Sequence, residues 1–113
     1  MAMSESARLH SLFVYGSLLD PDERERLIGR RIQAKAASLR GYERGRKRYF
    51  YVTKRDGTDV EGAILAGLSN DELAVLDGYE DVPSLYTRER INVLDTTGAI
   101  VECWIYLPTS WAE

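Results

Sequence analysis

Tyr15-Gly16-Ser17-Leu18 is the first segment of the sequence whose residues can do chemistry. It follows an apolar run, Leu12-Phe13-Val14, and precedes a helix start at Asp20. A strand that turns into a helix through Gly-Ser leaves several backbone N–H groups unpaired, and such groups bind a carboxylate, a phosphate or a developing oxyanion. Because many such turns contain Gly-Ser for steric reasons alone, the segment indicates a site only if a catalytic partner occurs elsewhere in the chain.

Glu80 is the candidate partner. It falls just after the predicted C-terminus of a helix and is flanked by Tyr79 and Val82. The negative end of a helix and partial desolvation both disfavour an ionised carboxylate, and Asp77 and Asp81 would raise the pKa of Glu80 further if they lie close. We expect a raised pKa, which suits a carboxyl that carries protons near neutral pH. The alternative is an ordinary exposed glutamate in a loop.

The elements that position these residues are mostly strands. Apolar, aromatic and β-branched patterns predict strands at residues 12–15, 32–39, 49–53, 60–65, 87–94 and 99–107. A first short helix is expected to begin with Asp20 as N-cap, Pro21 as its first residue and Glu23 as capping-box partner. It should stop near Gly29.

A second short helix is expected from Ser69, with Glu72 at the capping-box spacing, to a left-handed Gly78. Arg55-Asp56-Gly57 predicts a hairpin turn, and Gly62 a bulge or a close approach of two segments. Five or six strands with tight turns and two short helices predict an α+β fold. We expect a small, strongly bent or barrel-like sheet with the helices at its rim.

Length and composition predict a single domain over residues 1–113. Hydrophobic residues make up 44% of the chain, enough for a core. No apolar stretch approaches the roughly 18 residues of a transmembrane helix, so no membrane partner is expected. Residues 1–9 are expected to be a flexible leader, since they lack the regions of a signal peptide, and the expected location is cytoplasmic.

Cys103 and His10 are the only cysteine and the only histidine. One cysteine cannot form an internal disulfide, and its place in an alternating strand predicts a buried thiol. One Cys and one His cannot assemble a His/Cys metal cluster, and they give no support to Cys–His or Ser–His–Asp catalysis. A cation site made of carboxylates alone stays open, although no ligand loop is visible.

The segment from Arg30 to Arg48 is strongly basic, although the whole chain has a net charge of −3. It holds eight Lys or Arg residues against one acid, a net charge of +7. Arg44–Arg48 with Tyr49 and Tyr51 is one alternative functional surface, an RNA-binding one. A solvated loop that leads into a core strand is favoured over it, so no nucleic-acid partner is expected. Some of these cations can instead steer an anionic small substrate.

Two motifs together resemble the gamma-glutamylcyclotransferase-like family over residues 12–107. The residues that carry the resemblance are Tyr15-Gly16-Ser17-Leu18, Leu76-Asp77-Gly78-Tyr79-Glu80-Asp81-Val82, Tyr86-Thr87-Arg88, Gly41-Tyr42 and Val60-Glu61-Gly62. The resemblance implies an α+β fold built around a small mixed β-barrel. It also implies that Tyr15, Gly16, Ser17 and Leu18 form the substrate-binding loop, and that Glu80 is the catalytic acid–base residue.

The activity that the resemblance implies is an intramolecular cyclisation of a small γ-glutamyl substrate. The α-amine attacks the γ-carbonyl, and 5-oxoproline and an amine or amino acid are released without a metal or other cofactor. Whether the amides of Gly16–Leu18 bind the oxyanion or the substrate's α-carboxylate stays open, as does the leaving group. A non-enzymatic module that binds a small ligand in the same pocket is the alternative function. The sequence leaves both a monomer and a homodimer open.

Overall fold

Five strands form a closed barrel in the computed structural model of the protein, which describes residues 9–112. The strand order is β1-β3-β2-β4-β5, and the ring is closed by a parallel pairing of β1 with β5, while the other pairings are antiparallel. The strands are β1 (His10–Val14), β2 (Ala34–Arg46), β3 (Phe50–Leu68), β4 (Tyr86–Asp95) and β5 (Ile100–Pro108). The predicted α+β fold with a small mixed barrel is confirmed. The leader expected over residues 1–9 lies outside the described residues, apart from Leu9.

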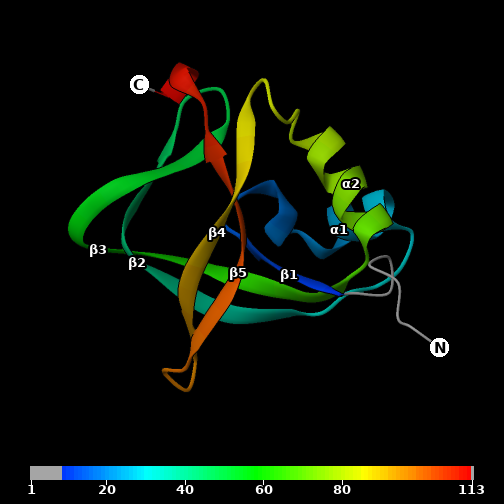
Figure 1. Ribbon diagram of the computed structural model, residues 1–113, viewed down its shortest axis with the longest axis horizontal. Coiled ribbons are helices and arrows are strands. Elements are labelled where there is room, and N and C mark those ends of the chain that lie inside the picture. The colour runs from blue at the N-terminus through cyan, green and yellow to red at the C-terminus, as the bar shows by residue number, and fades with distance from the viewer. Residues whose placement is uncertain (1–8, 113) are drawn as a thin grey trace.

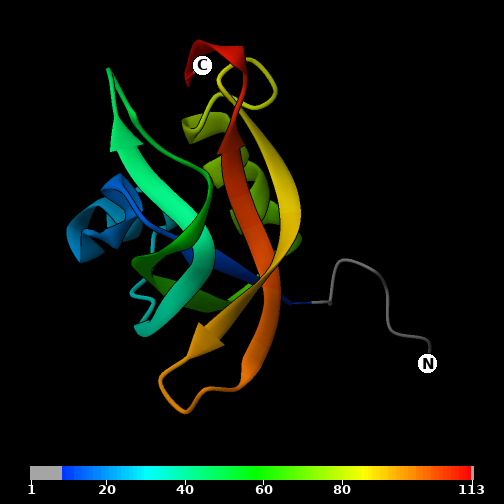
Figure 2. The same ribbon diagram turned by 90° about the vertical axis from the view of Figure 1, so that its left-hand side faces the viewer.

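Two α-helices, α1 (Pro21–Ile28) and α2 (Asn70–Tyr79), lie on one side of the barrel (Figure 1). Short 3-10 helices follow β1 and β5, namely η2 (Ser17–Leu19) and η3 (Ser110–Ala112). Figure 2 shows η3 at the same end of the molecule as the β2–β3 turn, with the β4–β5 turn at the opposite end. Of the helices that the structure describes, none has the length and apolar character needed to cross a membrane.

Side chains that alternate along β1 divide the core into two clusters. Leu12 and Val14 pack with Leu76 of α2 in the cluster beneath the helices, whereas Phe13 turns to the other face and joins a cluster made from the barrel strands. The close approach expected at Gly62 is confirmed, because a Cβ there would lie 2.3 Å from the carbonyl oxygen of Val14. Gly62 therefore lets β3 pass against β1.

The hairpin turn predicted at Arg55-Asp56-Gly57 is wrong. The chain turns between Arg46 and Phe50, and β3 then runs unbroken past residues 55–58. Pairing with β2 jumps from Lys54 to Asp59, so these residues form a bulge. Gly57 has a φ of +85°, and the left-handed backbone that it permits serves a bulge as well as a hairpin.

The start of α1 is as predicted, with one exception. Asp20 is the N-cap and accepts a hydrogen bond from Asp22 N at 2.9 Å, and Pro21 is the first helical residue. Glu23 does not close a capping box but pairs with Arg26 one turn on. Gly29 ends the helix in the left-handed conformation, as expected.

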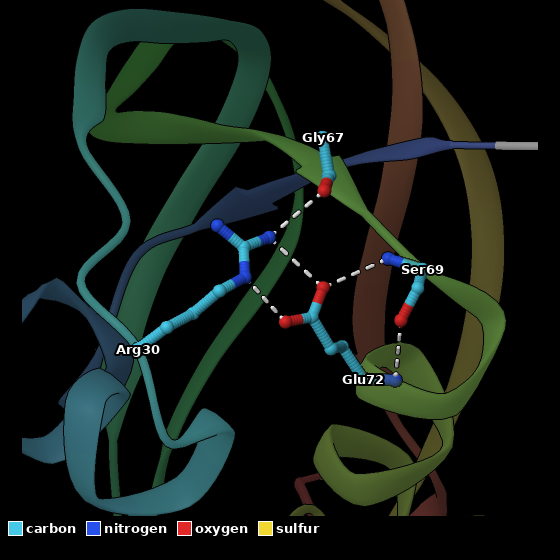
Figure 3. Close-up of polar contacts among 4 residues, drawn as sticks. All are labelled: Arg30, Gly67, Ser69 and Glu72. Atoms are coloured by element: carbon cyan, nitrogen blue, oxygen red, sulfur yellow. Dashed lines mark hydrogen bonds and ion pairs between the residues drawn. The ribbon is translucent and has the colours of Figure 1, made fainter.

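The capping box predicted for α2 is confirmed, and a third residue strengthens it (Figure 3). Ser69 N donates to Glu72 Oε1 at 2.9 Å, and Glu72 N donates to Ser69 Oγ at 3.1 Å. Arg30, just after α1, donates to both carboxylate oxygens of Glu72, at 2.5 and 2.9 Å, and to Gly67 O at 2.9 Å. This clamp ties the end of β3 and the start of α2 to the segment that follows α1.

The predicted end of α2 at Gly78 is wrong. The helix continues to Tyr79, and Glu80 is its C-cap. Asp81, with a φ of 56°, takes the left-handed conformation that we expected at Gly78. Aspartate tolerates this backbone better than most non-glycine residues, so the left-handed residue lies three positions later than expected.

Candidate functional site

A cavity of about 350 Å³ brings together the two segments singled out in the sequence. Tyr15, Gly16, Ser17 and Leu18 line it from the β1–η2 junction, and Glu80 lines it from the end of α2. The other contributors include Phe50, Tyr79, Tyr86 and Tyr106, and two arginines, Arg46 and Arg48. Residues 62 or more positions apart in the chain therefore share one small site.

The loop from Tyr15 to Leu18 is held by arginines from two directions. Arg44 Nη1 donates to Tyr15 O at 2.9 Å. Arg24 exposes only 4% of its surface and donates to the carbonyl oxygens of Leu18 and Leu19 at 3.1 and 3.0 Å. Nothing in the sequence separates Arg24 from Arg26, the other arginine of α1, except its place on the buried face, and sequence reasoning missed it.

Gly16 packs closely against Phe50. A Cβ at Gly16 would lie 3.1 Å from Phe50 Cβ, so the ring of Phe50 packs directly on the backbone there. Among the described residues, no backbone acceptor is recorded for the N–H groups of Gly16, Ser17 and Leu18. These are the unpaired donors that a strand-to-helix turn leaves.

Glu80 is a half-buried carboxyl that makes no hydrogen bond or ion pair from its side chain to any described residue. Its backbone is fixed, because Glu80 N donates to Leu76 O at 2.9 Å. Burial raises the pKa of Glu80 to about 7, and Asp77 and Asp81 are not among the causes. The ionised carboxylate in turn helps to raise the pKa of Tyr15, Tyr86 and Tyr106, which places its charge among these hydroxyls.

Asp77 has a structural partner instead. Arg88 Nε and Nη2 donate to its two carboxylate oxygens at 2.8 and 3.1 Å. Tyr106 OH donates to Asp77 Oδ1 at 2.8 Å. The last turn of α2 is therefore fastened to β4 and β5, and Glu80 follows directly from it.

Hydroxyl groups complete the walls of the cavity. Ser17 Oγ and Tyr79 OH form a 2.9 Å hydrogen bond that joins the loop to α2 directly. Tyr15 OH donates to Tyr106 O, and Tyr86 OH donates to Phe50 O, both at 2.5 Å. The sequence indicated Tyr79 only as an apolar neighbour of Glu80, since its hydroxyl partner comes from the other motif.

The residues considered for a metal site and for an RNA-binding surface can be placed within the part of the chain that the structure describes. No group of three or more His, Cys, Asp or Glu side chains there is arranged to hold a metal ion. Cys103 is buried, as predicted, and burial raises the pKa of its thiol to about 11. Tyr49 and Tyr51 are the aromatic residues of the RNA-binding alternative. Both pack edge to face with Trp111, with their ring centroids 5.9 and 5.6 Å from the Trp111 centroid.

Known proteins share both the sequence pattern and the fold. Residues 12–112 match the family model for gamma-glutamyl cyclotransferase, AIG2-like. AIG2-like protein D of Arabidopsis thaliana is 40% identical over 98 residues, which cover 83% of this chain and 62% of that protein. The chain thus spans less than two thirds of that relative's length.

Solved structures agree with the barrel architecture. The solution structure of an Arabidopsis thaliana protein superposes with a TM-score of 0.82 at 28% identity, covering 98% of this chain and 76% of that one. The structure of a gamma-glutamyl cyclotransferase gives a TM-score of 0.80 at 18% identity, covering 90% of this chain and 68% of that one. At that identity the likeness is one of fold.

Proposed function

Because this chain belongs to the gamma-glutamyl cyclotransferase, AIG2-like family, we propose that it cyclises the γ-glutamyl group of a small substrate. The α-amine attacks the γ-carbonyl carbon, and 5-oxoproline and an amine or amino acid leave. The observation that carries the proposal is the carboxyl of Glu80, which has no side-chain partner among residues 9–112 and a pKa raised to about 7, in one cavity with the Tyr15–Leu18 loop.

Glu80 would act as the proton carrier. The substrate's α-amine is mostly protonated at neutral pH, so a base must take one proton before the nitrogen can attack. As the new bond forms between the α-nitrogen and the γ-carbon, the bond from the γ-carbon to the leaving nitrogen breaks. Glu80 returns the proton to that leaving nitrogen. The second proton that the α-nitrogen sheds on ring closure also passes to the leaving nitrogen, so the amine leaves as an ammonium and the ring nitrogen keeps one hydrogen. A pKa near neutrality suits a group that must do both.

The loop would hold the substrate folded. Its unpaired N–H groups at Gly16, Ser17 and Leu18 are suited either to the oxyanion of the tetrahedral intermediate or to the substrate's α-carboxylate. Because the reaction is intramolecular, holding the amine against the carbonyl supplies much of the rate. This chemistry needs proton transfer and positioning, and no metal or organic cofactor is part of it.

The test is the release of 5-oxoproline from a panel of γ-glutamyl amino acids, γ-glutamyl amines and glutathione. The Glu80→Gln variant keeps the shape of the side chain and removes the titrating group, so kcat/KM should fall by about 10²- to 10⁴-fold. Glu89→Gln, which changes an exposed glutamate on β4, is the matched control and should keep wild-type activity.

Two outcomes would contradict the proposal. Wild-type turnover by Glu80→Gln would remove the role given to Glu80. Binding of the panel compounds without any 5-oxoproline release would instead favour a non-enzymatic module that uses the same cavity.

A further inference from the structure

Charge is unevenly distributed around the cavity. Among its described lining residues, only Arg46, Arg48 and Glu80 have charged side chains. Arg46 ends β2 and Arg48 lies in the β2–β3 turn, whereas Glu80 caps α2. The wall formed by the β2–β3 turn is therefore cationic, and the only acid is the group proposed to carry the proton.

Both arginines of this wall lack a carboxylate partner within residues 9–112. Arg46 Cζ lies 4.8 Å from the centroid of the Phe50 ring, and Arg48 Cζ lies 5.6 Å from that of Tyr49. A guanidinium that contacts an aromatic ring keeps its N–H donors available in its own plane. Both side chains are exposed, so these donors can meet a ligand at the rim.

The turn that carries them is fastened to the rest of the cavity. Tyr86 OH donates to Phe50 O at 2.5 Å, and Arg44 donates to Tyr15 O at 2.9 Å. Tyr49 and Tyr86 both pack edge to face with Trp111, with their ring centroids 5.9 and 5.6 Å from the Trp111 centroid. Figure 2 shows this turn and η3, which holds Trp111, at the same end of the molecule. The two cations are thus positioned at the cavity by contacts on both sides of the turn.

We propose that Arg46 and Arg48 make the site selective for γ-glutamyl compounds whose leaving group carries a free carboxylate. These are γ-glutamyl amino acids and peptides rather than γ-glutamyl amines. The inference rests on the proposed function and adds to it the class of the leaving group.

Charge distinguishes the two kinds of substrate. A γ-glutamyl amino acid carries one ammonium and two carboxylates, whereas the amide of a simple amine carries one of each. In the proposed reaction Glu80 takes a proton from the ammonium, and the loop N–H groups can serve one carboxylate. A second carboxylate then needs a donor of its own, and a guanidinium, which matches a carboxylate with two parallel N–H groups, supplies it.

The test compares γ-glutamyl-alanine with γ-glutamyl-ethylamide, which has hydrogen in place of the alanine carboxylate. We expect wild-type kcat/KM for 5-oxoproline release to be about 10-fold or more higher for γ-glutamyl-alanine. In the double variant Arg46→Gln/Arg48→Gln, the ratio of the two values should fall towards one. Arg40→Gln, an exposed arginine of the same strand outside the cavity, should keep the wild-type ratio.

Equal kcat/KM for the two compounds in the wild type would overturn the inference while leaving the proposed function intact. So would a double variant that lowers both values by the same factor, because the arginines would then bind the α-carboxylate that both compounds share.

Equilibrium binding of the same two compounds to Glu80→Gln, measured by calorimetry, separates selectivity from turnover. Tighter binding of γ-glutamyl-alanine that disappears in the triple variant with Arg46→Gln and Arg48→Gln supports the inference. Equal affinities would overturn it. Selective binding with no 5-oxoproline from either compound in the wild type would overturn the proposed function alone.

Discussion

Glu72 and Glu80 stand near the two ends of the same short helix, and the structure treats them in opposite ways. Glu72 accepts from Arg30 and from the backbone of Ser69 (Figure 3), and these donors lower its pKa to about 2. Glu80 has no donor among the described residues, and burial raises its pKa to about 7. One glutamate holds the helix in place, and the other has no protein partner among the described residues, as the proposed proton carrier requires.

The difference shows how a small domain can keep a buried carboxyl whose ionisation destabilises the fold. A carboxyl that is buried without a donor destabilises the folded state once it ionises. The clamp at Glu72 and the pairing of Asp77 with Arg88 hold both ends of α2, so Glu80 need not bond to the protein to be positioned. Its carboxyl lines the cavity, where the proposed substrate would meet it.

The largest effect expected from this contrast is on the pH dependence of activity. If the ionised form of Glu80 accepts the proton from the substrate, kcat/KM should fall below pH 7, to about one hundredth of its plateau at pH 5. The Glu72→Gln variant should show the same acid limb, because Glu72, with a pKa of about 2, stays ionised throughout pH 5 to 7. An acid limb centred near pH 4.5 in the wild type would contradict a raised pKa for Glu80 and its role as the proton carrier.

A smaller effect is expected on stability, with opposite signs for the two glutamates. The folded-state pKa of Glu80 lies above its ordinary value of 4.5, so its ionisation costs stability as the pH rises from about 4.5 to 7. Glu80→Gln should therefore be more stable than the wild type at pH 8, by roughly 1–3 kcal/mol, and equally stable below pH 4. Urea unfolding at both pH values measures this, with Glu89→Gln as a control that should show no such change.

The smallest effect is expected at the clamp. The folded-state pKa of Glu72 is lowered, so its ionised form contributes stability above about pH 4.5 that is lost as the pH falls towards 2. At pH 7, Glu72→Gln and Ser69→Ala should each cost about 1 kcal/mol and leave 5-oxoproline release within about twofold of the wild type. A loss of activity at full stability in either variant would mean that the clamp takes part in the chemistry.

Local signals explain what could be predicted from the sequence. The caps at Asp20 and Ser69 depend on residues within three positions, and both are where the sequence places them. Side-chain pattern indicated most strand positions in the same way. It missed the extension of β2 through Arg44–Arg46, where a solvated loop was favoured, and the continuity of β3 from Phe50 to Leu68. The position of Glu80 just beyond α2 was also predictable, because it depends only on the approximate position at which the helix ends.

Long-range contacts explain what could not be predicted. Gly57 requires a left-handed backbone in either a hairpin or a bulge, and only the pairing with β2 decides between them. Gly78 stays helical while Asp81 turns the chain. Burial of Arg24 depends on carbonyl groups of the loop, and the bond from Ser17 to Tyr79 joins segments 62 residues apart.

The most direct test of the central claim is a titration of both glutamates in one sample, followed through the side-chain carboxyl ¹³C signals by NMR. Signals assigned with Glu72→Gln and Glu80→Gln should give a pKa of about 7 for Glu80 and about 2 for Glu72 in the wild type. A value near 4.5 for Glu80 would contradict the account, because an ordinary exposed carboxyl would then stand where a proton carrier is proposed.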